Sequence, residues 1–186
     1  MTEIELKFRI NKKDIKKITN ILENIGYEFL GRKYEKTTMY DNNLEIMKKT
    51  DGRVRIRISG DKCEFSYKKP ITRKGIKKEI EYEVNVSGHK NIEKILKRME
   101  FQPTTSYERF RTTISKNGIK VTIDEFPFDN FIEIEGGEKE IVNLAKKLGL
   151  QMENNITKSC DTIFQEWRKK QGLIFKPHML FDSYDK

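Results

Sequence analysis

The fold class is decided by the stretch Glu3-Ile4-Glu5-Leu6-Lys7-Phe8-Arg9-Ile10, in which charged and apolar residues alternate without a break. Successive side chains of a β-strand point to opposite faces, so an extended chain here has one charged face and one apolar face. The apolar face requires burial. The charged face carries two carboxylates about 7 Å apart beside cationic side chains, a layout that suits a divalent metal ion and a polyanion. For this stretch alone, a half-buried antiparallel strand with its polar side in water is the simpler interpretation.

The same alternation returns in later segments, where like charges are concentrated on the polar face. The acidic groups are Glu3/Glu5, Glu79/Glu81/Glu83 and Glu133/Glu135, and the basic pairs are Arg55/Arg57 and Arg109/Arg111. An open sheet with one face in water predicts mixed, interchangeable polar residues instead. Like charges crowded on one strand repel each other unless opposite charge lies between them. Closing the sheet with its charged face inward gives each charge a partner across the lumen. We therefore predict an α+β fold. Its eight-stranded antiparallel sheet forms a closed tunnel, or barrel, with a charged lumen and helices packed outside.

Turn and cap signals divide the chain into elements. Strands are predicted at residues 3–10, 27–40, 53–58, 62–68, 77–84, 107–114, 119–124 and 131–135. Helices are predicted at about 11–25, from 87 or 91 to 99, at 138–148 and at 159–171. Pro70 is expected to end its strand, and residues 101–103 to end the second helix. We expect one domain over residues 1–186, with tunnel strands at about 2–135 and C-terminal helices and an apolar, packed tail at about 138–186.

Composition restricts the class of protein further. No apolar run approaches the roughly 20 residues of a bilayer span, and the acidic N-terminus is not a signal peptide, so we expect a cytoplasmic protein without a membrane partner. Cys63 and Cys160 are far apart and have no histidine neighbours, which favours core thiols over a disulfide framework or a zinc site. The net charge of +9 attracts polyanions, and by itself it allows nucleic acid, phosphorylated metabolites or acidic lipid.

The residue types on the strand faces narrow this choice. Arginine holds phosphate oxygens in a planar two-point grip, lysine acts as a compact point charge, and grouped carboxylates bind magnesium or manganese. A triphosphate substrate with its metal ion needs all three residue types together.

Seven ordered motifs resemble those of the CYTH or triphosphate tunnel metalloenzyme family, which includes class IV adenylate cyclases, thiamine triphosphatases and inorganic triphosphatases. The motifs span about residues 1–165 and are Glu3-x-Glu5-x-Lys7, Arg55-x-Arg57, Ser66-Tyr67-Lys68-x-Pro70, Glu79-x-Glu81, Arg109-x-Arg111, Asp124 and Glu133-x-Glu135. This chain departs from the family at Cys160, where a tyrosine is usual, and at residues 37–41, where an acidic residue usually precedes an aromatic pair. These departures leave the choice of substrate open.

The resemblance implies specific site residues. It implies that the metal is held at Glu3, Glu5, Glu133 and Glu135, with Asp124 on the metal side. It implies that the phosphates are held by Lys7, Arg55, Arg57, Lys68, Arg109 and Arg111, and by Lys158 beside a plug helix. Glu3, Glu5, Lys7 and Arg57 are the expected catalytic residues.

The leading functional hypothesis is a phosphohydrolase that depends on Mg²⁺ or Mn²⁺ and acts on inorganic tripolyphosphate or on a nucleoside or thiamine triphosphate. A class IV adenylate cyclase is the alternative within the family, and a non-catalytic binder of nucleotides, polyphosphate or RNA is the alternative outside it. The expected partner is the small-molecule triphosphate. Nucleic acid is not expected as a partner, and a homodimer is compatible with the sequence.

Overall fold

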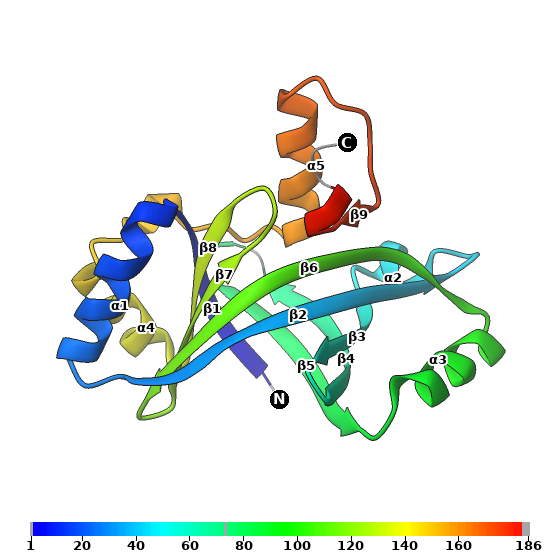
Figure 1. Cartoon of the computed structure of the whole chain (residues 1–186), viewed down its shortest axis with the longest axis horizontal. Helices are drawn as coiled ribbons and strands as arrows, with labels where there is room; N and C mark the ends of the chain where they lie inside the picture. Colours follow the sequence, from blue (N-terminus) through cyan, green and yellow to red (C-terminus); the bar gives the residue numbers. More distant parts are fainter. Residues whose placement is uncertain (1, 73, 184–186) are drawn as a thin grey trace.

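The computed structural model describes residues 2–72 and 74–183 and shows a closed β-barrel (Figure 1). Its eight strands, counted over those residues, are β1 (Thr2–Ile10), β2 (Glu28–Asn42), β3 (Arg53–Ser59), β4 (Lys62–Thr72), β5 (Lys77–Val86), β6 (Phe101–Lys116), β7 (Ile119–Glu125) and β8 (Asn130–Glu135). They pair in the order β2-β3-β4-β5-β1-β8-β7-β6, all antiparallel, and β6 pairs back with β2. The predicted α+β tunnel is therefore confirmed, and β1 lies between β5 and β8.

Two strand boundaries differ from the prediction. Pro70 lies inside β4, because the register to β5 shifts between Pro70 and Thr72 and such an irregularity tolerates a residue without an N–H donor. Residues 101–103 do end the second helix, but β6 already begins at Phe101. There it pairs with the far end of β2, whose register shifts between Met39 and Tyr40, opposite Pro103.

Helices α1 (Ile15–Asn24) and α4 (Glu138–Lys147) cover the outer face of β1, β7 and β8. Leu6 and Phe8 of β1 point outward and pack in one cluster with Ile18 and Leu22 of α1. Leu6 and Leu22 are both fully buried. Burial of each such side chain contributes about 1.5–3 kcal/mol, so the apolar half of the alternating pattern holds the helices to the barrel.

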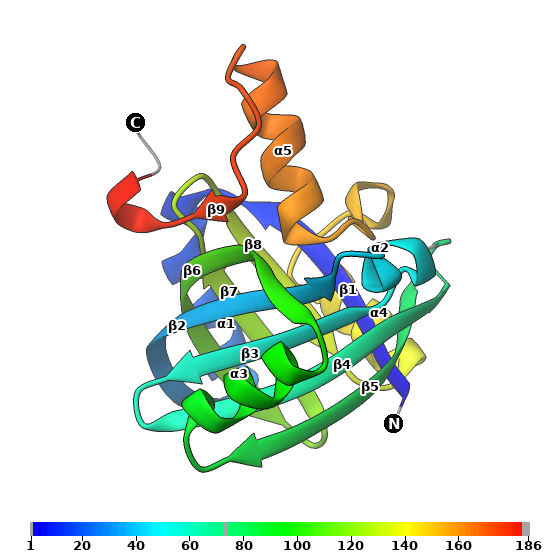
Figure 2. The same ribbon diagram turned by 90° about the vertical axis from the view of Figure 1, so that its right-hand side faces the viewer.

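Two further clusters lie on other parts of the outer surface. Helix α3 (His89–Arg98) places Leu96 over Val54, Ile56 and Cys63 of β3 and β4, and it is seen in front of these strands in Figure 2. Helix α5 (Cys160–Lys170) packs Ile163 and Phe164 against aromatic residues at the end of β7 and the start of β8. The short helix α2 (Ile46–Thr50) joins β2 to β3.

The C-terminal tail packs only in part. Met179 of the two-residue strand β9 (His178–Met179), which runs parallel to β6, is buried, as expected. Ile174 and Phe175 are 84% and 71% exposed, so the expectation of packing is wrong for this segment. The last residues of the predicted tail and domain, 184–186, and residue 1 lie outside the described residues. Within the described ranges, no helix has the length and apolar character that a bilayer crossing requires.

Candidate active site

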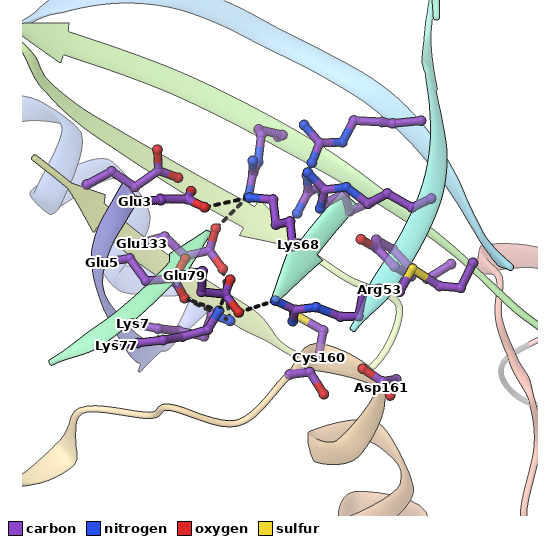
Figure 3. Close-up of a pocket in the computed structure, with 18 residues that line it drawn as sticks. Glu3, Glu5, Lys7, Arg53, Lys68, Lys77, Glu79, Glu133, Cys160 and Asp161 are labelled. Atoms are coloured by element: carbon purple, nitrogen blue, oxygen red, sulfur yellow. Dashed lines mark hydrogen bonds and ion pairs between the residues drawn. The ribbon is translucent and has the colours of Figure 1, made fainter. Parts of the chain in front are cut away.

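The lumen of the barrel is a charged cavity of about 70 Å³. Figure 3 shows the side chains that line it. Of the 18 described residues that line it, eight are lysine or arginine and six are aspartate or glutamate. The inward half of the alternating pattern supplies all of these charges except Asp161, which lies on α5. The lining includes the predicted residues Glu3, Glu5, Lys7, Arg55, Arg57, Lys68, Arg109, Arg111, Glu133 and Glu135.

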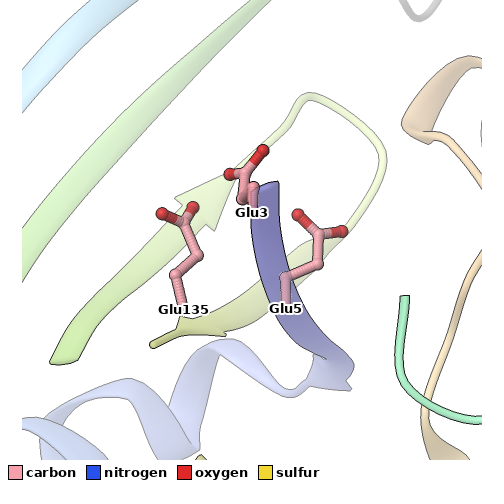
Figure 4. A group of neighbouring side chains, drawn as sticks. All are labelled: Glu3, Glu5 and Glu135. Carbon is pink, nitrogen blue, oxygen red and sulfur yellow. The ribbon is translucent and has the colours of Figure 1, made fainter. Parts of the chain in front are cut away.

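Three carboxylates meet at one side of the lumen and form a candidate metal site (Figure 4). Glu3 and Glu5 come from β1 and Glu135 from β8, and each offers an oxygen such that all three oxygens lie within 4.8 Å of one another. Glu5 and Glu135 are direct cross-strand partners, so their like charges would repel each other without a cation. Clustered carboxylate oxygens are the donors that Mg²⁺ and Mn²⁺ prefer, so this set fits such an ion.

The ionisation of this cluster is uneven. The pKa of Glu135 is raised to about 7, chiefly by burial, with Lys120 opposing the shift and Glu3 adding to it. Burial would also raise the pKa of Glu3. Lys68, whose Nζ lies 2.6 Å from the Glu3 carboxylate, and a hydrogen bond with Glu81 lower that pKa to about 2. A cation bound here would therefore replace a proton on Glu135 and would compete with Lys68 for Glu3.

Asp124 and Glu133, which were also predicted on the metal side, do not belong to this three-carboxylate cluster. Asp124 is fully buried and accepts hydrogen bonds from Arg109 at 3.0 Å and from Arg111 at 2.6 Å. Glu133 lies 3.0 Å from Lys7 and 2.7 Å from Arg111. The register explains this, because Asp124 of β7 directly faces Arg111 of β6.

The opposite part of the lumen is basic. Arg55 and Arg57 of β3 and Arg109 and Arg111 of β6 flank β2, which pairs with both strands. Burial lowers the pKa of Arg57, and the charges of the other three arginines lower it further, to about 10. Arg57 therefore lies in a surplus of positive charge, which an anion in the lumen would relieve.

Two cations missed by the sequence analysis also line the cavity. Lys77 lies 2.8 Å from Glu5 and 2.7 Å from Glu79, and Arg53 forms an ion pair with Glu79. Both lie on the charged faces of predicted strands, 53–58 and 77–84, but neither belongs to the motifs that suggested site residues. The sequence around Glu35 of β2, whose carboxylate lies 2.7 Å from Arg109, shows no group of like charges that would have marked it as a lumen residue.

Two predicted features lie elsewhere. Arg9, on the charged face of the first stretch, is outside the lumen, with its side chain 53% exposed and paired with Asp129 at 2.5 Å. Lys158 is 56% exposed, lies 2.6 Å from Glu166 of α5 and does not line the lumen. The residues of the predicted plug helix that do line it are those at its N-terminus, Ser159, Cys160 and Asp161. Cys160 therefore lines the cavity while also packing against the α5 cluster.

A closed antiparallel tunnel with a carboxylate cluster on one side and arginines on the other defines a class of protein with an enclosed, charged lumen. The family model of the CYTH domain matches residues 1–160, and this chain belongs to that family.

Similar proteins carry related names. A Methanocaldococcus jannaschii protein named "putative adenylate cyclase" is 26% identical over 170 residues, which cover 86% of this chain and 96% of that protein. A Vibrio parahaemolyticus structure of the same description superimposes with a TM-score of 0.79 at 17% identity, covering 89% and 98% of the two chains. A Hippeastrum structure, described as a "putative adenylyl cyclase" with a dominant triphosphatase activity, gives a TM-score of 0.64 at 17% identity, covering 94% and 97% of the two chains. At these identities the two structures show a shared fold.

Proposed function

We propose that the protein is a divalent-metal-dependent phosphohydrolase that removes the terminal phosphoryl group of a triphosphate bound in the tunnel. The observation that carries the proposal is the pairing of the Glu3/Glu5/Glu135 cluster with the arginines of β3 and β6 inside one lumen. Inorganic tripolyphosphate and nucleoside and thiamine triphosphates share the polyphosphate group that this pairing suits. The triphosphatase activity named for the Hippeastrum homologue supports the same reaction class.

Each side of the lumen has its own task in this proposal. Glu3, Glu5 and Glu135 would hold Mg²⁺ or Mn²⁺, which supplies Lewis-acid neutralisation of phosphate charge when bound. Arg55, Arg57, Arg109 and Arg111, with Lys7 and Lys68, would bind the remaining phosphate oxygens. Carboxylates of the lumen already hold these arginine and lysine side chains in place, so the side chains need little reorganisation when the substrate enters.

The chemistry requires no nucleophilic side chain. Phosphoryl transfer to water depends on positioning and on neutralisation of charge, and both are properties of a rigid, charged tunnel. Barrel strands fix the lining residues through backbone hydrogen bonds, and the N-terminal residues of α5 complete the lining.

Substitution Glu5→Gln tests the proposal. It keeps the size of a side chain that is 5% exposed but removes one charge from the metal cluster. We expect metal-dependent release of phosphate from tripolyphosphate to fall at least about 100-fold, with the circular dichroism spectrum unchanged. Glu23→Gln, the same change at an exposed position of α1, is the matched control and should retain activity. Unchanged activity of Glu5→Gln would refute the metal assignment.

An adenylate cyclase is the second candidate, favoured by the name of the Methanocaldococcus relative. In that reaction the ribose 3′-hydroxyl attacks the α-phosphate and pyrophosphate leaves, while the same cations hold the same triphosphate. Incubation with ATP and either metal separates the candidates, because one yields orthophosphate and the other cyclic AMP with pyrophosphate. Binding of tripolyphosphate without either product would indicate a non-catalytic module.

A further inference from the structure

We propose that Tyr107 and Thr37 act together with Arg57 as one binding site for a phosphoryl group, in which the two hydroxyl groups donate hydrogen bonds beside the guanidinium group. This inference rests on the proposed function in one respect, which is that the bound anion is the polyphosphate group of the substrate.

The three residues form a single row across adjacent strands. Thr37 of β2 is the direct cross-strand partner of Arg57 on β3 and of Tyr107 on β6. Directly opposite residues of an antiparallel pair have Cβ atoms about 4.5–5.5 Å apart and point to the same face, which is the lumen face here. Arg57 and Tyr107 line the cavity. Thr37 is fully buried and lies between them in the row of paired residues.

Two atoms of this row have unused hydrogen-bonding capacity. In the part of the chain that the structure describes, the buried side-chain polar atoms without a hydrogen-bond partner are Thr37 Oγ1, Arg57 Nε, Ser59 Oγ and Arg168 Nη1. The first two therefore belong to neighbouring residues on the lumen face. A buried donor without a partner is costly, so two such donors side by side favour an acceptor that arrives with the ligand.

Arg57 also has longer ion pairs than Arg109 and Arg111. Its contacts are 3.3 Å from Nη1 to Glu64 and 3.8 Å from Nε to Glu35. Arg111, by contrast, makes contacts of 2.6 Å with Asp124 and 2.7 Å with Glu133. An anion therefore competes with weak contacts at Arg57 and with strong ones at Arg111.

The surroundings of Tyr107 suit a donor to an anion. Its ring is held by Phe126 at 5.8 Å between centroids and by the Arg109 guanidinium at 5.9 Å from the ring. Burial would raise the pKa of the phenol, but the charges of Arg55, Arg109 and Arg57 lower it below the ordinary value. The hydroxyl group thus lies within the field of three guanidinium groups and becomes a better hydrogen-bond donor.

Isothermal titration calorimetry of tripolyphosphate binding, carried out in EDTA, tests the inference in the absence of metal and turnover. A hydrogen bond to a charged group typically changes affinity by about tenfold or more, so Tyr107→Phe and Thr37→Val should each weaken binding by at least about tenfold. Thr37→Ser keeps the hydroxyl group and should restore binding to within about threefold. Tyr82→Phe, the same change at a side chain that is 65% exposed, is the matched control and should bind normally.

A second measurement separates binding from structure. Thr37→Val removes a buried hydroxyl group that has no partner in the ligand-free protein, so its thermal unfolding midpoint should not fall. Binding by Tyr107→Phe and Thr37→Val within twofold of the unsubstituted protein would overturn the inference, as would absence of any binding by the unsubstituted protein. Selective loss of binding in these variants would support the inference even if the protein hydrolysed no triphosphate. Absence of hydrolysis would overturn only the proposed function.

Discussion

Individual charges in this lumen are tolerated because each has a partner within reach. A buried carboxylate or guanidinium group without a partner is strongly unfavourable, so the inner surface is a network and not a set of separate contacts. Glu35 shows the effect. Burial would raise its pKa, but Arg109, Arg111 and Arg57 lower it to about 2.

The low pKa of Glu35 predicts a pH-dependent contribution to stability. A carboxyl group whose pKa is lower in the folded state stabilises the protein above its unfolded pKa of about 4.5, and this contribution is lost as pH falls toward 2. We expect Glu35→Gln to lower the free energy of unfolding by about 3 kcal/mol at pH 7 and by much less at pH 3.

Urea unfolding at both pH values measures this difference. Glu28→Gln, on the exposed start of the same strand, is the control and should change little at either pH. An equal loss for Glu35→Gln at pH 7 and pH 3 would show that the carboxylate charge is not the cause.

Among the elements, α5 links the outer packing of the barrel to the mouth of the tunnel. Its N-terminal residues Ser159, Cys160 and Asp161 line the lumen, while Phe164, one turn further on, packs against Phe128 at 5.2 Å between ring centroids. Aromatic contacts outside the barrel, where β7 ends and β8 begins, therefore fix the position of the α5 residues that line the lumen.

Phe164→Ala should remove this support. Phe164 is 1% exposed, and truncation of a buried phenylalanine costs about 3–5 kcal/mol, part of which arises from the cavity that remains. Chemical denaturation measures the loss. Phe175→Ala, the same change at a side chain that is 71% exposed, should cost less than about 0.5 kcal/mol. Equal losses at the two positions would contradict the packing role of α5.

At the scale of the whole molecule, the barrel separates two charge surpluses across one lumen. The order of strands places β1, with Glu3 and Glu5, four positions away from β2 in a ring of eight, and the arginine-bearing strands β3 and β6 lie on either side of β2. The carboxylate cluster and the basic side therefore face each other. In the proposed function, a cation and a polyanion bound between them would neutralise each other as well as the wall.

This arrangement predicts cooperative stabilisation by ligands. Mg²⁺ and tripolyphosphate together should raise the free energy of unfolding by about 2.7 kcal/mol at 100 times the dissociation constant. Each ligand alone should raise it less than the pair, and the sum of the separate effects should fall short of the joint effect. Thermal unfolding with each ligand, with both and with EDTA measures these differences. Strictly additive shifts would show that the two sides bind independently.

Much of the fold was predictable from the sequence because alternation is a local property. A period of two fixes which side chains share a face, and the concentration of like charges on those faces indicates that they point inward. The strands, the covering helices and most of the lining, including Arg55, Arg109 and Glu133, follow from this pattern. Pro70 was misplaced because a register shift depends on the neighbouring strand.

The sequence by itself therefore determined that this chain closes into a tunnel with a charged interior. Only the tertiary structure decided which charges meet, because distances across a lumen depend on register and strand order. For this reason Asp124 pairs with arginines outside the carboxylate cluster, Glu35 enters the network without a local signal, and Arg9 and Lys158 lie outside it. The sequence did not relate Thr37 and Tyr107 to Arg57, because that relation exists only since β2 pairs with β3 on one side and with β6 on the other.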